Sequence, residues 1–152
     1  MTTVVWRGLD EPRMEVAHVQ RDEAVLRAAG TQIGVAYELR YELAPDALRL
    51  EIVGGRTAEV ELDGADFFDL GNSPLFNSLP VLRDGLLDGG EPRDYAMRWV
   101  SVPGLEVSEQ RQRYVPLPDR VVRFEADDFV AEIRFGEDAL VEHYPGLAER
   151  VS

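Results

Sequence analysis

The strongest constraint on the fold is a run of alternating residues in the first third of the chain. Over residues 32–43, QIGVAYELRYEL, large apolar side chains alternate with charged or small ones. Successive side chains of a β-strand point to opposite faces of a sheet, so a period of two predicts a strand with one buried face. We expect one strand over this whole run, with its buried face formed by Ile33, Val35, Tyr37, Leu39, Tyr41 and Leu43.

Further short strands follow the same pattern at residues 48–53, 56–62, 93–102, 119–126, 129–135 and 139–144. Turn pairs such as Gly54-Gly55 and Asp63-Gly64 separate some of them, because glycine accepts the positive φ of a tight turn. A helix is conceivable at residues 21–30, with Asp22 as N-cap and Gly30 as its stop, but a strand fits equally well. The pattern predicts a mostly β, single-domain protein over residues 1–152, an antiparallel curved sheet forming a roll or incomplete barrel with little helix.

Composition narrows the classes of partner. The chain has 29 acidic and 16 basic residues, a net charge of −13, and no cysteine. Such a field repels phosphate backbones and anionic lipid surfaces, which argues against nucleic-acid binding and against stable membrane insertion. No metal-ligand or cofactor motif is recognisable, and we expect no metal site and no cofactor. No secretory signal is visible at the N-terminus, so we expect a cytoplasmic protein.

An apolar segment interrupts the strand pattern at residues 66–83, DFFDLGNSPLFNSLPVLR. Its glycine, asparagines and prolines predict an irregular loop over residues 71–83, although Leu75, Phe76 and Leu79 are apolar. We expect Asp69, Asn72, Pro74 and Pro80 to shape and anchor this loop, with the Asp69 carboxylate accepting backbone N–H groups of residues 71–73. The loop either gates a cavity or plugs the core, and both interpretations explain its residues.

A second polar segment lies at residues 109–118, EQRQRYVPLP. If it is extended, Gln110, Gln112 and Tyr114 share one face and the two arginines, Arg111 and Arg113, share the other. Amides beside a tyrosine suit hydroxyl-rich ligands, because each amide offers donors and an acceptor side by side. An exposed strand whose arginines pair with the surplus acids would look the same.

Three segments in this order, residues 69–83, 102–117 and 129–147, resemble a bacterial family of glycolipid-binding proteins that was once catalogued as of unknown function. The resemblance covers nearly the whole chain. Two departures stand beside it. The family's Pro-Phe-Thr-Asn-Thr-Leu-Pro type of segment reads Pro74-Leu75-Phe76-Asn77-Ser78-Leu79-Pro80 here, and Leu82 replaces the first of two basic residues that follow it. The motifs that carry the resemblance are Asp69-Leu70, Ser73-Pro74, Asn77, Leu79-Pro80, Arg83, Pro103, Leu105, Gln112-Arg113-Tyr114, Leu140-Val141 and Tyr144-Pro145-Gly146.

The resemblance implies a fold similar to that of the lipoprotein-localisation factors, a curved sheet around an apolar interior. We therefore expect non-enzymatic binding of an amphiphilic small molecule, a lipid or glycolipid. Sheet residues such as Tyr37, Leu39, Tyr95 and Trp99 would wall the cavity. The candidate ligand-binding residues are Asn77, Arg83, Gln112, Arg113, Tyr114, Tyr144, Trp99 and Tyr95.

Two other functions stay open. A protein–protein module or homodimer would use the apolar 71–83 segment as its docking surface. A hydrolase of sugar or lipid esters would need a general acid or base, for which the candidates are Asp69, Glu15, His143 and Tyr144. No catalytic motif pairs these groups with a nucleophile, so we expect no enzyme.

Overall fold

The computed structural model describes residues 1–22, 25–34 and 36–152, and within them it forms one curved, unclosed sheet of 13 strands. The predicted mostly β fold is confirmed. The first seven strands are β1 (Thr2–Gly8), β2 (Met14–Asp22), β3 (Val25–Ile33), β4 (Glu38–Leu43), β5 (Ala47–Ile52), β6 (Thr57–Glu61) and β7 (Phe67–Leu70). The others are β8 (Arg93–Val100), β9 (Val107–Leu117), β10 (Val121–Ala126), β11 (Phe129–Phe135), β12 (Val141–Tyr144) and β13 (Ala148–Arg150).

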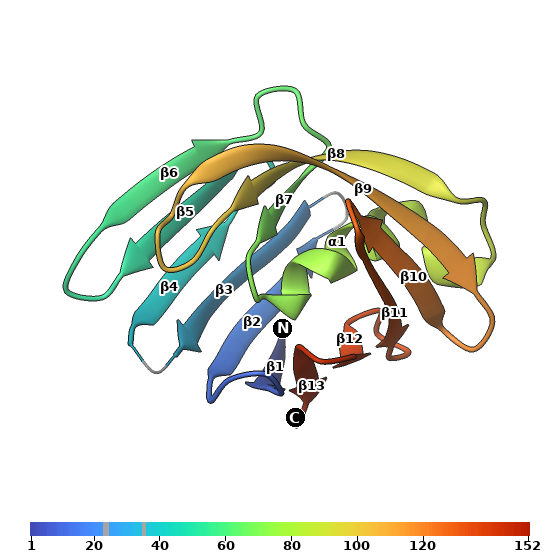
Figure 1. The fold of residues 1–152 in the computed structure, drawn as a ribbon, viewed down its shortest axis with the longest axis horizontal. Helices are drawn as coiled ribbons and strands as arrows, with labels where there is room; N and C mark the ends of the chain where they lie inside the picture. The colour runs from blue at the N-terminus through green and yellow to red at the C-terminus, as the bar shows by residue number, and fades with distance from the viewer. Residues whose placement is uncertain (23–24, 35) are drawn as a thin grey trace.

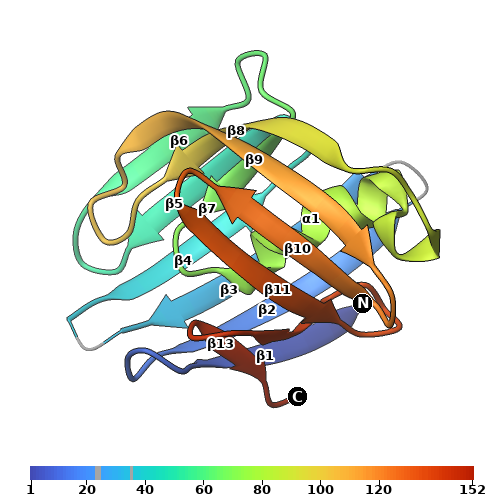
Figure 2. The same ribbon diagram turned by 45° about the vertical axis from the view of Figure 1, so that its right-hand side comes forward.

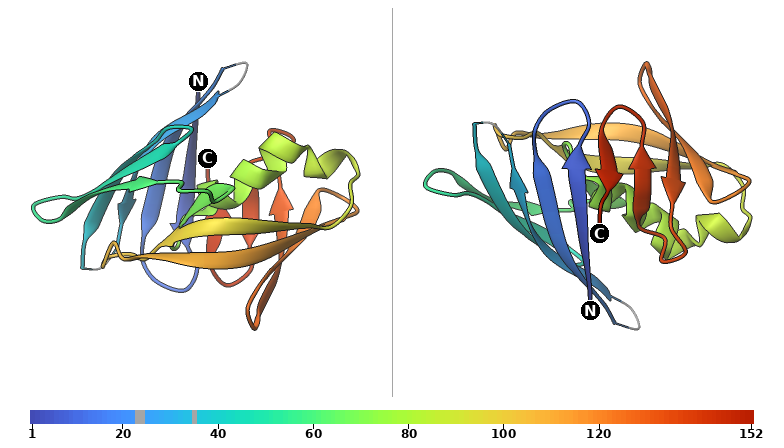
Figure 3. Two further views of the ribbon diagram at one scale, coloured as in Figure 1. Left: turned by 90° about the horizontal axis from the view of Figure 1, so that it is seen from above. Right: turned by 90° about the horizontal axis from the view of Figure 1, so that it is seen from below.

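Two meanders make up the sheet, and the chain ends join them. Strands β1 to β6 follow one another on one side, and β13 back to β8 follow on the other. Strand β1 pairs with β13 in the middle, so the first and last strands lie side by side (Figure 3). The two free edges are β6 and β7.

One pairing differs from the predicted antiparallel arrangement, because β7 pairs with β8 in parallel. Parallel neighbours need a crossover connection, and here the chain between the two strands supplies it with a helix. That helix is α1 (Pro74–Asp84), followed by a short 3₁₀ turn at Leu86–Asp88. No helix in the described residues is long and apolar enough to cross a membrane.

Helix α1 corrects the prediction of a loop at residues 71–83. Pro74 occupies the first turn, where its missing N–H costs nothing, and Gly85 ends the helix in the left-handed conformation with φ of 60°. Pro80 lies inside the helix and is buried. The prolines and asparagines of this segment are typical of a loop, which is why the sequence predicts one. Burial of the apolar residues between them favours the helix instead.

The helix lies inside the curve of the sheet (Figure 1), between strands β9 to β11 in front and β2 to β4 behind (Figure 2). All residues from Pro74 to Val81 are buried. Leu75 is 0% exposed and Phe76 1% exposed, and the Phe76 ring lies 5.6 Å from that of Tyr41. In this structure α1 fills the interior that the sequence suggested as a cavity.

The long strand predicted at residues 32–43 is partly wrong. Residues 38–43 form β4, and Leu39, Tyr41 and Leu43 face the core as expected. The chain turns before that strand, where the Gly34 N–H donates to the Tyr37 carbonyl, and Ile33 is 48% exposed. Val35 lies outside the described residues. The alternation of apolar and polar residues therefore runs across the connection between β3 and β4. The pattern alone does not reveal that the chain turns there.

The candidate helix at residues 21–30 is not formed in the described residues. Residues 21 and 22 end strand β2 and residues 25–30 belong to β3, whereas residues 23 and 24 lie outside the described part. Gly30 does not stop a helix. It stands opposite Tyr41, and a Cβ on Gly30 would come within 2.9 Å of the Tyr41 hydroxyl oxygen. The glycine thus makes room for a buried tyrosine hydroxyl.

Candidate functional site

An open cavity of about 830 Å³ lies at the N-terminal end of α1. Its floor comes from the end of β7 and the start of α1, and its walls come from β8, β9 and the β10–β11 hairpin. The lining residues that the sequence also singled out are Asp69, Asn72, Asn77, Trp99, Gln110 and Tyr144. We regard this cavity as the candidate functional site.

Asp69 is the most buried acid of the cavity, with 9% of its surface exposed. Its Oδ2 accepts a hydrogen bond of 2.5 Å from Gln112 Nε2, and the same amide nitrogen donates to Gln110 Oε1 at 2.8 Å. Burial raises the pKa of Asp69 to about 6, and the bond from Gln112 opposes that rise. The predicted anchoring bonds from residues 71–73 are not among the contacts of the described residues, and Asp69 is held by β9 instead.

Asn77 and Tyr144 complete the polar floor. Asn77 is 4% exposed, and its Nδ2 donates to the Tyr114 hydroxyl at 3.3 Å. Tyr144 is 5% exposed, and burial together with the nearby Asp69 charge raises the pKa of its hydroxyl. Tyr114 lies behind Asn77, at 1% exposure, and supports the cavity without lining it.

One wall of the cavity consists of residues that the sequence did not single out as ligand-binding candidates. Phe124 and Phe129 face it, and their ring centroids lie 6.1 Å apart. Asp127 and Asp128 form its rim at the turn between β10 and β11. Two adjacent acids between two phenylalanines, in the segment FEADDF, were the available signal, but it also fits an ordinary hairpin turn.

Four candidates lie away from the cavity. Arg83 and Tyr95 are at the other end of α1, where the Tyr95 hydroxyl donates to Asp84 Oδ2 at 2.6 Å and the Arg83 guanidinium lies 4.0 Å from the Phe67 ring centroid. Arg113 is on the outer face of β9, 3.3 Å from Asp94 Oδ2. Pro80 is buried inside α1.

The segment before α1 is anchored from another direction. Asn72 adopts a φ of 64°, and its carbonyl accepts a hydrogen bond of 3.1 Å from Gln32 Nε2 on β3. Ser73 donates its hydroxyl to Glu15 Oε1 on β2 at 2.6 Å. The first turn of α1 is therefore tied to the first meander, as well as to β9 through Asn77.

Glu15 is the centre of a closed polar cluster next to the cavity. It is 3% exposed, and its Oε1 accepts hydrogen bonds from Ser73 and from the Tyr41 hydroxyl, while Oε2 has no partner among the described residues. Burial raises the pKa of Glu15 to about 7, against the opposing hydrogen bonds and the charge of Arg13. Glu15 and Asp69, two of the candidate catalytic acids or bases, contact different partners: Glu15 contacts Ser73 and Tyr41, whereas Asp69 contacts Gln112.

Comparison with known proteins agrees with this fold. A model of the family described as "Putative glycolipid-binding" matches residues 51–150. The chain belongs to this family. The resemblance inferred from the sequence motifs is thereby confirmed, and all the residues that line the cavity fall within the matched range.

A solved structure with the same fold is that of a DUF1089 family protein from Pseudomonas aeruginosa. The two structures superpose with a TM-score of 0.71 and 22% sequence identity, over 90% of this chain and 92% of that chain. At this identity the likeness shows the fold alone. No curated protein matches the chain.

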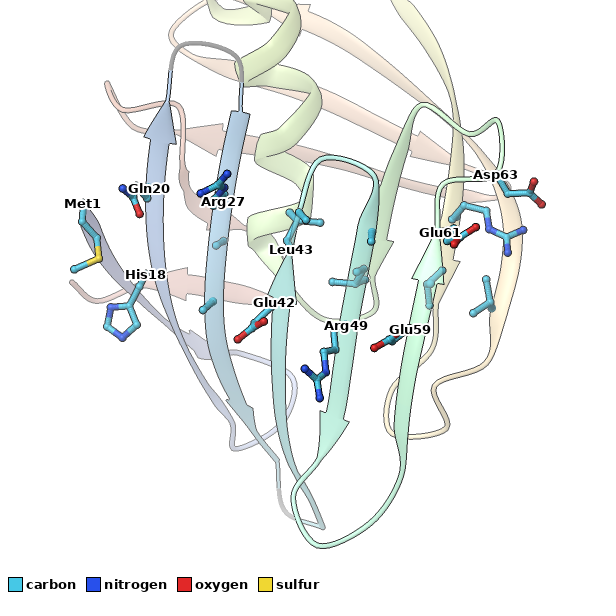
Figure 4. Close-up of a pocket in the computed structure, with 18 residues that line it drawn as sticks. Met1, His18, Gln20, Arg27, Glu42, Leu43, Arg49, Glu59, Glu61 and Asp63 are labelled. Atoms are coloured by element: carbon cyan, nitrogen blue, oxygen red, sulfur yellow. The ribbon is translucent and has the colours of Figure 1, made fainter.

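A second hollow, of about 1010 Å³, lies over strands β2 to β6 and shares no residue with the sites that the sequence predicted. His18, Glu42, Arg49 and Glu59 project into it from neighbouring strands (Figure 4). Acidic and basic side chains intermingle there. We interpret it as a solvated outer face, because mixed charges of this kind satisfy one another and water.

The structure also bears on the docking surface that a protein–protein module would need. Leu75, Phe76, Leu79 and Val81 of the 71–83 segment are buried in the core, and Leu82 is partly buried against it. They are not available to a partner in this folded state, so a homodimer would have to use another surface.

Proposed function

We propose that the protein binds an amphiphilic small molecule, a lipid or glycolipid, without transforming it, and that the cavity beside Asp69 holds its head group. The observation that carries the proposal is the pairing of apolar walls with a buried polar floor. Asp69, Asn77 and Tyr144 form that floor, and Trp99, Phe124 and Phe129 stand around it. Ligand pockets combine largely apolar walls with a few placed polar groups in this way.

The size of the cavity supports the proposal. About 830 Å³ lies within the range of roughly 300–1,000 Å³ that is typical of small-molecule sites. Because α1 fills the interior, the proposed place for the apolar part of the ligand is the wall formed by Leu70, Val102, Ala126 and Leu147. The family description, which names glycolipids, agrees with a ligand of this kind.

The contacts of the candidate acids and bases support binding over chemistry. Asp69 contacts an amide, and Glu15 contacts two hydroxyls inside a closed cluster. His143, the residue before Tyr144 on β12, stands opposite Arg134 of β11 and Glu149 of β13 in the strand register. A hydrolase needs a nucleophile or an activated water within reach of a general base. The Ser73 hydroxyl on Glu15 has this geometry, but Ser73 is 2% exposed and Glu15 3% exposed, and their bond anchors the start of α1.

Native mass spectrometry of protein purified without detergent tests the proposal, followed by organic extraction and lipid analysis. We expect a discrete adduct of one small molecule per chain. Leu147→Trp, which places a large ring in the cavity wall, should remove the adduct. Val53→Trp is the matched control, because Val53 is an exposed residue outside the lining and its replacement should keep the adduct. A folded wild-type protein that remains free of adducts after incubation with a total lipid extract would contradict the proposal.

A further inference from the structure

The charge of the cavity constrains the head group. Among its described lining residues three are aspartates, Asp69, Asp127 and Asp128, and none is lysine, arginine or histidine. An anionic head, such as a carboxylate or a phosphate, would be repelled in a site that offers it no counter-ion. The cavity therefore favours a head group without negative charge.

Hydrogen-bonding capacity narrows the class further. Gln112 donates from its Nε2 to both Asp69 and Gln110, so its amide protons are used within the protein. Its Oε1 is buried and has no partner among the described residues. Asp69 lines the cavity, is nine-tenths buried, and bonds through Oδ2, which leaves Oδ1 as an acceptor. The cavity thus presents the carboxylate oxygen Oδ1 of Asp69 as an acceptor, next to the buried Oε1 of Gln112.

A protonated amine matches that carboxylate better than a sugar does. An ammonium carries three donors and no acceptor, whereas each sugar hydroxyl brings acceptor lone pairs along with its proton. Asp69 has no ion-pair partner among the described residues, and a ligand cation would provide one. A charge-assisted bond to a buried carboxylate is among the stronger contacts that a site of this kind can make.

The aromatic wall points the same way. The centroid of Phe129 lies 6.1 Å from that of Phe124 and 6.3 Å from that of Tyr144, and the Phe124 and Tyr144 centroids are 6.4 Å apart. Three rings therefore share one side of the cavity. The face of an aromatic ring attracts a cation, and the attraction strengthens where water is excluded.

We propose that the head group this cavity selects is an alkylammonium, a protonated amine carried on an apolar tail, with Asp69 as its counter-ion and the rings of Phe124, Phe129 and Tyr144 beside it. The inference rests on the proposed function, because it names the chemical class of the ligand for the same site. It separates an amine from the uncharged sugar head and from the anionic head of a fatty acid.

Isothermal titration calorimetry with three eight-carbon amphiphiles tests it: octylamine, octyl glucoside and sodium octanoate. The tails are the same, so differences in affinity report the head group. We expect octylamine to bind at least tenfold more tightly than octyl glucoside at pH 7.5, and octanoate to give no measurable binding. Asp69→Asn should weaken octylamine binding at least tenfold.

Two further variants keep the test decisive. Asp119→Asn removes the same charge at the opposite end of β10, outside the cavity, and should leave octylamine binding within twofold of wild type. Phe129→Leu changes a residue that is 49% exposed, and we expect it to weaken octylamine binding three- to fivefold while binding of octyl glucoside changes less. It serves in place of Asp69→Asn if that variant does not fold.

The outcomes separate the inference from the function on which it rests. If octyl glucoside binds as tightly as octylamine or more tightly, the inference is overturned and the proposed function stands. Equal losses in Asp69→Asn and Asp119→Asn would mean attraction to the net charge of −13, which also overturns the inference. If none of the three binds and no adduct appears by mass spectrometry, the proposed function fails as well.

Discussion

Two buried carboxylates, Glu15 and Asp69, lie on either side of the start of α1 and have different surroundings. Both have a pKa raised by burial, to about 7 for Glu15 and about 6 for Asp69. Glu15 receives the hydroxyls of Ser73 and Tyr41 in a closed cluster, whereas Asp69 receives one amide and lines an open cavity. Burial alone therefore does not identify a binding site. A hydrogen-bond acceptor that also remains reachable from solvent is the feature that identifies one.

The comparison also assigns different tasks to the two regions. The Glu15 cluster ties β2 and β4 to the first turn of α1, and so holds the helix inside the sheet. The Asp69 region lines an open cavity, and the ring of Phe129 there is 49% exposed. We expect changes around Glu15 to affect stability most, and changes around Asp69 to affect ligand binding most.

The largest expected effect is that of Phe76→Ala in the closed region. Phe76 is 1% exposed and packs against Tyr41, so its truncation should lower the free energy of unfolding by about 3–5 kcal/mol. Phe129 is 49% exposed, and Phe129→Ala should cost less than about 1 kcal/mol while weakening ligand binding. Urea unfolding of the two variants gives the difference. Equal losses would show that the cavity wall supports the fold as much as the interior does.

The next effect depends on pH and isolates Glu15. Its pKa rises on folding from 4.5 to about 7, so the folded state holds a proton that the unfolded state releases. The stability contributed by this proton is fully present below about pH 4.5 and is lost as pH rises through about 7. Glu15→Gln cannot ionise and should escape the loss. At pH 8 the variant should be more stable than wild type by about 3 kcal/mol, since a pKa change of one unit corresponds to about 1.4 kcal/mol.

Unfolding curves of wild type and Glu15→Gln at several pH values between 4.5 and 8 provide the measurement. The Asp69 carboxyl shifts in the same direction and titrates in both proteins, so subtracting the two curves removes its contribution. A difference that stays constant with pH would mean that Glu15 is ionised in the folded protein and that its hydrogen bonds outweigh its burial.

The fold was largely predictable because its strands carry the alternating pattern that a one-sided sheet requires. Residues 109–117 illustrate this, since Gln112 and Tyr114 are buried and Arg111 and Arg113 are exposed, as expected for one extended strand. Helix α1 escaped prediction because Pro74 and Pro80 usually mark loops. Burial from Leu75 to Val81 stabilises the helix, and burial depends on contacts with distant strands.

The cavity was predictable only in part, for a related reason. Asn77 lies in α1 and Tyr144 lies at the end of β12, far apart in the sequence. The fold brings both side chains to the cavity that Asp69 also lines. Arg83 looked equivalent to Asn77 in sequence, but it lies at the other end of α1, because six residues along a helix span about 9 Å. Phe124 and Phe129 lie on the two strands of the β10–β11 hairpin and line the cavity. No local sequence pattern specifies toward which part of the fold that hairpin projects.

A smaller effect compares the two anchors of α1. Ser73→Ala removes a buried donor to Glu15, and loss of a hydrogen bond to a charged or partly charged acceptor costs about 1.5–3 kcal/mol. Asn77→Ala removes a 3.3 Å bond between neutral groups, for which we expect about 1 kcal/mol. Thermal unfolding at pH 8 should rank the two variants in that order. The reverse order would place the main anchor of the helix at β9.

The smallest effect concerns the far end of α1, where Arg83 lies over the Phe67 ring at 4.0 Å. The Arg83 side chain is 52% exposed, and a cation–π contact at an exposed site is worth about 0.5–1 kcal/mol. Arg83→Met should therefore lower stability by no more than that, while Arg83→Lys, which keeps the charge, should lower it less. Because Arg83 is outside the cavity lining, titration of Arg83→Met with octylamine should give the wild-type affinity. A marked loss of octylamine binding would mean that the polar residues at both ends of the helix act on one ligand, and that the division between a closed anchor and an open site does not hold.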